Sequence, residues 1–431
     1  MQLIKDKKVA ATLAAATCAL LGTQPAQANE QKDDAWQFDT AILYYGESDR
    51  VQLVEGVFNA KKDFGDEHIF SAKLVVDTLT GASASGAVAQ PGVQTFTRPS
   101  GNGSYQVNAG ETPLDDTFRD TRVQLSGQWT QPIFENTRVS TGFNFSNEYD
   151  YLSIGANASL ARDFNRKNTT LSFGVSYQFD SIDPVGYAPI GLAQMQLASE
   201  FDSEEAFRTA FDATRDTEDK DKDTFDVLLG LTQVINKRML MQFNYGYSVV
   251  DGYLNDPYKL VSVVNDTGLT LRNLHENRPD ERTKHNVFWQ TKYALDSGVI
   301  DVSYRYSTDD WDIDSHTIDS RFRWNISETS YIQPHFRYYT QSAAKFYEPF
   351  LEESTPLPMF ASADYRLGEM DAYTIGLKYG QTLSNGHKWA VRAEYYSQRP
   401  TSDGTAAIGV LNDLDLYPSI DAFILQFNYH F

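Results

Sequence analysis

The ten residues 422–431 read AFILQFNYHF, and their side chains alternate in character. Every second position from 423 is apolar or aromatic: Phe423, Leu425, Phe427, Tyr429 and Phe431. The side chains between them are mostly polar. Because successive side chains of an extended chain point to opposite sides, this stretch predicts a strand with one apolar and one polar face.

The same alternation recurs along the chain, for example in MQFNYGYSVV (241–250), YIQPHFRYYTQ (331–341) and WAVRAEYYSQ (389–398). The polar faces of these segments carry arginine and glutamate together. A soluble sandwich would turn such faces to bulk water, whereas a membrane barrel would turn them to a wet lumen and the apolar faces to lipid. Alternation alone does not choose between these two architectures.

The lengths of the connections favour the barrel. Clusters of Gly, Asn, Asp and Pro divide the chain into about sixteen strands, an even number as in bacterial barrels. Their expected starts are Trp36, Val51, His68, Thr117, Thr137, Tyr149, Asn168, Thr224, Met239, Lys284, Gly298, Ile313, Ser330, Glu369, Lys388 and Ile420. Short turns such as FGDE, NRKN and LSNGH alternate with connections that include five long ones, at 79–116, 181–222, 252–283, 343–368 and 400–419. This pattern predicts an all-β transmembrane antiparallel barrel with short periplasmic turns and long extracellular loops, in contact with outer-membrane lipids.

The N-terminal residues and the composition agree with this location. Residues 1–28 have the basic start, the short apolar stretch and the Ala-Gln-Ala ending of a secretory signal peptide, which leaves 29–431 for the barrel. The only cysteine, Cys18, lies within the signal, so disulfides and cysteine-ligated clusters are excluded from the mature chain. The formal net charge of −21 argues against a nucleic-acid partner. We therefore expect the cell outer membrane as the location.

The C-terminal strand has a second meaning in a barrel. In lipid every backbone group must be paired, so the last strand has to close against the first. An aromatic terminal residue on the lipid face also looks like the signal that outer-membrane assembly machinery reads. We therefore expect Phe423, Leu425, Phe427, Tyr429 and Phe431 to form an assembly signal for the barrel-assembly machinery.

Several longer motifs resemble one family. They are YYGESDRVQLVEG, DTLTGASASG, VVDGYLNDPYKLVSVV, ENRPDERTKH, SYRYSTDDWDIDSHT, PHFRYYTQSAAKFYEP and SADYRLGEMDAYTIGLKYG. Together they are similar to uncharacterised Gram-negative outer-membrane barrels that carry a domain of unknown function. The resemblance implies the fold and the location. It also implies a redox context, because such proteins are often encoded beside flavin-transfer or thioredoxin-like proteins, and hence a candidate periplasmic redox or lipoprotein partner.

The polar faces of the expected strands supply the candidate lumen. The lumen-lining residues are Lys73, Asp77, Arg122, Arg305, Arg321, Arg323, His335, Arg337, Lys378, Arg392 and Glu394, with Glu55, Lys292 and Asp319 on the same faces. Cations outnumber anions in this set although the chain is acidic. One interpretation is structural, since facing charges pair and stiffen a barrel wall. The other is functional, a conduit or cavity that favours anions or holds a partner.

Three loop features are further candidates. Asp310, Asp312 and Asp314 alternate in DDWDIDSH and could ligate a hard cation, although the glycine and glutamate of a calcium loop are missing and a solvated acidic turn explains them as well. The charge run at 212–223 is expected to be disordered. Before it, Asp202 and Glu205 suggest a capping box that opens a short helix, which would plug the lumen, cover the mouth or lie on the rim.

Nothing in the sequence identifies a catalytic site. His275, His285 and His316 lie in or near long loops where Ser262 or Ser315 could approach them, but no nucleophile-elbow, zinc-protease or haem-attachment motif occurs. We expect no catalytic residues and no cofactor. The sequence thus favours a porin-like channel for small polar or anionic solutes. A sleeve that holds a redox carrier or lipoprotein, and an outer-membrane enzyme, are the alternatives.

Overall fold

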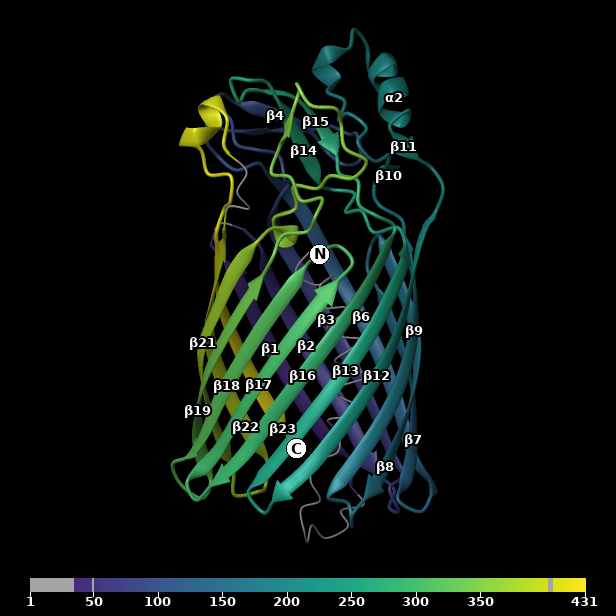
Figure 1. Ribbon diagram of the computed structural model, residues 1–431, viewed down its shortest axis with the longest axis vertical. Helices are drawn as coiled ribbons and strands as arrows, with labels where there is room; N and C mark the ends of the chain where they lie inside the picture. Colours follow the sequence, from purple (N-terminus) through teal and green to yellow (C-terminus); the bar gives the residue numbers. More distant parts are fainter. Residues whose placement is uncertain (1–34, 49, 402–405) are drawn as a thin grey trace.

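The computed structural model describes residues 35–48, 50–401 and 406–431. Sixteen strands within these ranges form one closed antiparallel barrel in chain order (Figure 1). They are β1 (Gln37–Glu47), β2 (Gln52–Asp63), β3 (Ile69–Ala84), β6 (Leu114–Phe134), β7 (Thr137–Asn147), β8 (Tyr151–Phe164), β9 (Thr169–Ile182), β12 (Lys220–Asn236), β13 (Met239–Gly252), β16 (Glu281–Leu295), β17 (Gly298–Asp309), β18 (Asp314–Asn325), β19 (Ser330–Gln341), β21 (Met370–Thr382), β22 (Lys388–Pro400) and β23 (Ile420–His430). The predicted fold class is confirmed, and every expected strand start lies within four residues of an observed one. The predicted signal peptide at 1–28 lies outside the described residues.

The last strand closes the barrel on the first. β23 pairs with β1 from Ala422 to His430, and the amides and carbonyls of Phe38 and Phe431 bond each other at 2.8 and 3.0 Å. The rings of the same two residues are 5.3 Å apart. The aromatic end of the chain is therefore part of the seam, where no backbone group of the final residues is left as a free edge.

The two faces of the wall follow the alternation in the sequence. Along β23, Phe423, Leu425 and Phe427 are 43–49% exposed and lie on the outside of the isolated chain. Elsewhere Ile42 and Ile375 are about 60% exposed on the same outer surface. Such a continuous apolar surface around a closed barrel is the surface that a membrane would cover.

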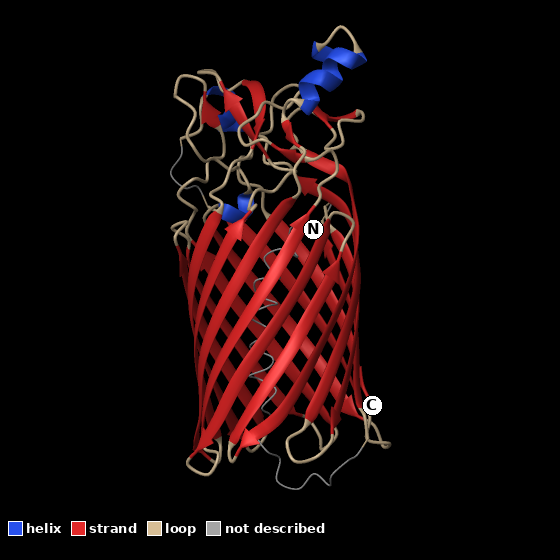
Figure 2. Ribbon diagram, turned by 90° about the vertical axis from the view of Figure 1, so that its right-hand side faces the viewer, coloured by secondary structure: helices blue, strands red, loops and turns tan. Residues whose placement is uncertain are grey.

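All connections at one end of the barrel are short, and we call it the turn end (the lower end in Figures 1 and 2). Asn136 is the second residue of the two-residue turn between β6 and β7 and has a φ of 57°. Asparagine tolerates this left-handed conformation better than most residues, and it allows the two strands to reverse tightly. Gly65 and Gly386 have positive φ in two other turns of this end.

The opposite end, the loop end, carries a folded cap (Figures 1 and 2). The cap consists of the five long connections 85–113, 183–219, 253–280, 342–369 and 401–419, with residues 402–405 not described. Its elements are β4 (Gln94–Thr97), β5 (Ser104–Val107), β10 (Ala188–Pro189), η1 (Ala198–Glu200), α2 (Glu204–Asp212), β11 (Arg215–Asp216), β14 (Leu260–Val264), β15 (Thr270–His275), β20 (Leu351–Glu352), η2 (Tyr365–Leu367) and η3 (Gly409–Asp413). No described helix is long and apolar enough to cross a membrane.

The cap crosses the mouth of the barrel. β14 follows β13, yet the amide of Leu260 bonds the carbonyl of Ser85 (2.8 Å), just after the end of β3. Lys259 Nζ donates to the carbonyl of Ala84, and the amide of Val88 donates to Ser262 Oγ (3.1 Å). Since β3 and β13 lie on nearly opposite sides of the strand order, the chain after β13 must span the opening to make these contacts.

The cap also has a core of its own. β14 is buried along its whole length and pairs with β15 on one side and β20 on the other. Val261, Val263, Leu274 and Leu351 pack together there with Ala361 and Ala363. A strand that is apolar except for Ser262 and buried on both faces stabilises the cap as a folded layer.

A buried charge network ties β15 to the η2 region. Arg278 bonds Glu276 (2.7 Å) and Asp364 (2.7 Å), and all three side chains are at most 10% exposed. Burial alone would raise the pKa of Asp364, but the positive charges of Arg366 and Lys259 hold it well below its usual value. Burial lowers the pKa of the Lys259 ammonium. Such a network favours one arrangement of the cap, because breaking any pair leaves a buried charge uncompensated.

Two expectations for the loops are wrong in detail. The N-cap of α2 is Ser203, whose Oγ accepts from the amide of Ala206 (3.2 Å), so the expected capping box from Asp202 does not form. The helix stands in the cap, away from the barrel interior (Figure 1), and it is not a plug. The charge run at 212–223 is ordered: it contains β11 and the start of β12, where Lys222 bonds Asp180 (3.0 Å).

Candidate functional site

The candidate lumen residues all lie on barrel strands, on the face opposite to the exposed apolar side chains. In β18, for example, Ile318 and Trp324 are exposed on the outside. Asp319, Arg321 and Arg323 occupy the alternate positions of the strand, whose side chains point to the inner face. The remaining members are on β3, β6, β17, β19, β21 and β22 and follow the same rule: Lys73, Asp77, Arg122, Arg305, His335, Arg337, Lys378, Arg392 and Glu394.

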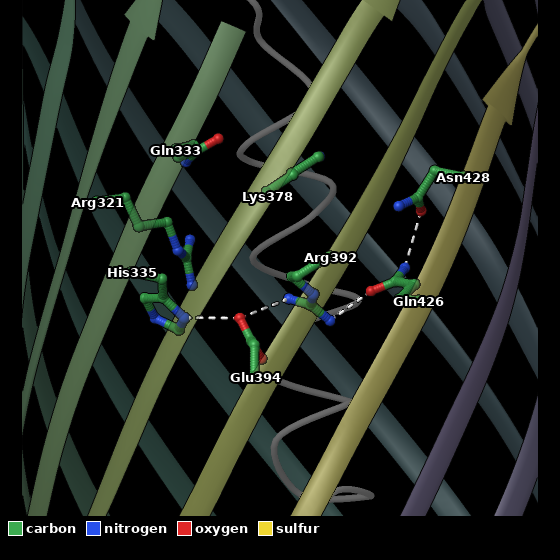
Figure 3. Close-up of a pocket in the computed structure, with 8 residues that line it drawn as sticks. All are labelled: Arg321, Gln333, His335, Lys378, Arg392, Glu394, Gln426 and Asn428. Carbon is green, nitrogen blue, oxygen red and sulfur yellow. Dashed lines mark hydrogen bonds and ion pairs between the residues drawn. The ribbon is translucent and has the colours of Figure 1, made fainter.

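Five adjacent strands, β18, β19, β21, β22 and β23, bring part of this set around a cavity of about 230 Å³ (Figure 3). The lining residues are Arg321, Gln333, His335, Lys378, Arg392, Glu394, Gln426 and Asn428. The cavity lies in the half of the barrel nearer the turn end, because Lys378 and Gln426 are each four residues from that end of their strands. The three amides were not singled out from the sequence, although they share the parity of the charged residues.

His335 forms the centre of the cavity wall. Its Nδ1 lies 2.8 Å from Glu394 Oε1 and its Nε2 lies 2.9 Å from Asp319 Oδ2. An imidazole can bond two carboxylates in this way only if both nitrogens carry hydrogen, so the geometry favours the cationic ring. The ring thereby joins β18, β19 and β22 across the inner surface.

Arginines surround the same two carboxylates. Arg321 and Arg337 approach Asp319 at 3.2 and 3.7 Å, and Arg392 approaches Glu394 at 3.6 Å. Arg392 also donates to Gln426, which bonds Asn428 at 2.8 Å (Figure 3). Two carboxylates therefore pair with three guanidinium groups and one imidazole, so this part of the wall carries a net positive charge.

Further cations on this side have no ion pair among the described residues. Arg305 lies over the ring of Phe288 (5.5 Å) and Arg323 over the ring of Tyr331 (3.8 Å). Lys378 lines the cavity between them and Arg392. We call the inner surface of β16–β22, with these three cations and the His335 network, the basic wall.

The other side of the barrel is closer to electrical balance. Arg122 Nη2 bonds Asp77 at 2.6 Å and lies 3.7 Å from Glu55, while Arg138 bonds Asp163 at 2.7 Å. Lys73 is exposed and has no ion pair within the described parts of the chain. The lumen charges therefore differ between the two sides: they are mostly paired on β2–β9 and unbalanced on the basic wall.

The predicted metal ligands do not converge. Asp310 Oδ1 accepts from the amide of Thr283 (3.0 Å), and Asp314 Oδ1 accepts from Tyr306 Oη (2.8 Å) on the outer surface. Asp312 lies in the turn between them with a φ of 67°. Among the described residues, ligand atoms of Asp120, Glu148 and Asp150 do lie within 4.8 Å of one another, at the rim below the cap. Their spacing along the sequence has no metal-site pattern, which is why they were missed.

The candidate serine–histidine pairs are also not assembled. Ser262 Oγ donates to Asn273 Oδ1 (2.7 Å) and pairs in register with that residue, not with His275. His316 Nδ1 bonds Tyr304 Oη (2.7 Å), and it lies on the opposite strand face from its neighbour Ser315. No catalytic role follows from these contacts.

The family model for a protein of unknown function, DUF3570, matches residues 10–431. The chain belongs to the DUF3570 family. No curated protein matches it.

Among solved structures, this DUF3570 chain is similar to a bacterial polysaccharide outer membrane secretin, with 9% identity, a TM-score of 0.43 and coverage of 93% of this chain and 99% of the other. The siderophore receptor PirA from Acinetobacter baumannii matches with 6% identity and a TM-score of 0.42, covering 93% of this chain and 60% of the receptor. The CymD monoaromatic hydrocarbon channel matches with 6% identity and a TM-score of 0.37, covering 92% and 88%. We take no activity from these likenesses.

Proposed function

We propose that this DUF3570 barrel is an outer-membrane channel for small polar solutes that favours anions. The observation that carries the proposal is the basic wall, where Arg305, Arg323 and Lys378 have no ion pair among the described residues beside a cavity of about 230 Å³. Charges that line a water-filled passage act at short range on a permeating ion. The buried acidic groups Glu276 and Asp364 of the cap are paired with cations, and exposed loop acids such as Asp310 are screened by salt.

The orientation follows the usual plan of such barrels: the turn end faces the periplasm and the cap faces the cell exterior. A solute entering from outside then meets the cap before the lumen. The passage therefore needs a path between the cap segments or a movement of β14 and its neighbours. The cap, in this proposal, controls access, and the basic wall selects the ion.

The test is electrical. The detergent-extracted full-length mature barrel is inserted into planar bilayers, and the reversal potential is measured across a KCl gradient. We expect the barrel to conduct ions, with a reversal potential closer to the equilibrium potential of chloride than to that of potassium. A preference for potassium would overturn the role of the basic wall. Fractionation with the outer membrane and heat-modifiable migration on gels test the location, and recovery as a soluble periplasmic protein would exclude it.

One observation favours a second function, a sleeve for a periplasmic redox or lipoprotein partner. The cap spans the loop end, whereas the connections of the described barrel strands at the turn end are all short turns, so access to the lumen is freer from the periplasmic side. A sleeve would conduct poorly and would co-purify with its partner. Mass spectrometry of the extracted protein distinguishes the two functions, since a channel needs no stoichiometric partner.

A further inference from the structure

A buried arginine of the cap has no counter-charge. Arg215, on the short strand β11, is 8% exposed, and no carboxylate of the described residues lies within ion-pair distance of its guanidinium. Its Nε has no hydrogen-bond partner within the described structure, and its guanidinium lies over the ring of Phe211 at 4.4 Å. Burial lowers the pKa of Arg215 to about 10, which leaves the side chain charged at neutral pH. A buried cation without an anion is costly and rare in folded proteins.

Two more buried donors, on Tyr253 and His275, are also unpartnered, and both residues interact electrostatically with Arg215. His275, at the end of β15, is 6% exposed, and neither ring nitrogen has a hydrogen-bond partner in the described structure. The hydroxyl of Tyr253 is buried and has none either. Buried polar groups are nearly always bonded, so a set of three exceptions in one region indicates a group that the protein alone does not supply.

One segment, 188–193, brings Arg215 and His275 together. Arg215 pairs with Pro189 in the β10–β11 sheet, and the amide of Ile190 bonds the carbonyl of Thr214 (2.9 Å). Two residues further, the backbone of His275 bonds Leu192 (3.0 Å) and Ala193 (2.9 Å). Burial, and then the charge of Arg215, lower the pKa of His275 to about 3, so its ring is neutral and has one N–H to donate.

The backbone of this segment and of the residue before it is strained. Tyr187, directly before the segment, and Leu192, within it, have φ values of 64° and 58°, in the left-handed region that bulky side chains rarely adopt. Such conformations persist where the surroundings impose them, and they concentrate at binding sites. The strained backbone is an observation independent of the unpartnered donors. It occurs in the segment that positions Arg215 and His275.

Three carboxylates of the cap are neutralised by other cations: Glu276 and Asp364 bond Arg278, and Asp256 bonds Arg366 at 3.0 Å. Asp150 has no ion pair among the described residues, but it accepts from Tyr258 Oη (2.6 Å) and is not within ion-pair distance of Arg215. The charge of Arg215 is therefore left for a ligand, and the acids that face Tyr253 do not take it up.

We propose that Arg215, His275 and Tyr253 bind a small oxyanion, a phosphate, sulfate or carboxylate group, in the cap. The guanidinium presents paired donors that fit two oxygens of such a group, and the imidazole N–H and the phenol O–H supply two further donors. The bound anion joins β11, β15 and the chain after β13, so it stabilises the closed cap. This site does not depend on ion conduction through the lumen.

The experiment measures cap opening and binding in the detergent-extracted full-length protein. Hydrogen exchange of residues 260–275 reports opening, and calorimetric titration with inorganic phosphate, sulfate or acetate reports binding. At a phosphate concentration one hundred times the dissociation constant, the open fraction of the cap should fall about a hundredfold. The response should disappear in Arg215→Met, whose cap without phosphate should be at least as protected as that of the natural protein.

Arg272→Met is the matched control, because Arg272 is also a cap cation on β15 but lies 3.9 Å from Glu353. It should keep the phosphate response. If hydrogen exchange shows that the cap of Arg215→Met is unfolded, the variants Tyr253→Phe and Arg215→Lys test the site instead. Each of them should weaken phosphate binding about tenfold or more. Absence of binding of all three anions to the natural protein, equal responses in Arg215→Met, or an unchanged affinity in both Tyr253→Phe and Arg215→Lys would overturn the site and leave water as the partner of these donors.

Discussion

Removing the three unpaired cations of the basic wall should abolish most of the anion preference. The perturbation is the triple variant Arg305→Gln, Arg323→Gln, Lys378→Gln. In water, a unit charge about 8 Å from a permeating ion contributes about 0.5 kcal/mol. Salt at 0.1 M, with a Debye length of about 10 Å, reduces this roughly by half. The three charges together then change the energy of an ion in the lumen by about 0.7 kcal/mol, lowering it for chloride and raising it for potassium.

The difference between the two ions is therefore about 1.4 kcal/mol, which corresponds to about a tenfold change in the chloride-to-potassium permeability ratio. The assay is the reversal potential of single channels in planar bilayers at about 0.1 M salt. Raising the salt to about 1 M, where the Debye length is about 3 Å, should shrink the difference between the natural and the variant protein.

A matched variant of opposite sign sharpens the test. Asp301 lies on the inner face of β17, 3.8 Å from Lys292, and Asp301→Asn should raise the chloride preference about twofold by the same calculation. Lys237→Gln, in an exposed turn at the turn end, should leave the ratio unchanged. A triple variant that keeps its chloride preference, or an Asp301→Asn that lowers it, would refute the assignment of selectivity to the basic wall.

Three further changes test the seam and the cap. Changing Phe431 and Tyr429 to Ser should reduce the amount of folded, heat-modifiable barrel without affecting export across the inner membrane, and an unchanged folded yield would remove the assembly signal. Arg278→Met leaves Glu276 without its cation and should destabilise the cap by about 3–5 kcal/mol, seen as faster proteolysis of 260–280 while the barrel stays heat-modifiable. The folded pKa of His275, about 3, lies below its ordinary 6.5, so its contribution to cap stability is complete above pH 6.5 and is lost as the pH falls towards 3, by about 1.4 kcal/mol per unit. In buffer free of phosphate and sulfate, the protection factor of β15, which is the intrinsic exchange rate at each pH divided by the observed rate, should therefore fall below pH 6.5, and a constant protection factor would contradict the neutral buried ring.

The barrel could be predicted because its determinants are local. A strand with one face in lipid and one in water repeats every two residues, and a turn interrupts the repeat after about ten residues. The final strand shows this directly: Phe423, Leu425 and Phe427 are exposed on the outside, as their spacing predicts. The same parity also identifies Gln426 and Asn428 as cavity residues, a step that attention to charge alone misses.

The cap could not be predicted in the same way, because its contacts join segments that no repeat relates. One signal was present: LVSVV at 260–264 is apolar except for Ser262 and does not alternate, as expected of a strand buried on both faces. Its partners Leu274 and Leu351 could be identified only once the barrel had placed the ends of β13 and β19 around one mouth. The same holds for Arg215 and His275, which are 60 residues apart and meet only through the strained segment between β10 and α2. A chain that only lined a pore would not need this layer. The cap buries unpaired donors and its own ion network above the opening, so the proposed anion binding in the cap and the proposed ion selection in the lumen can be disrupted by separate variants.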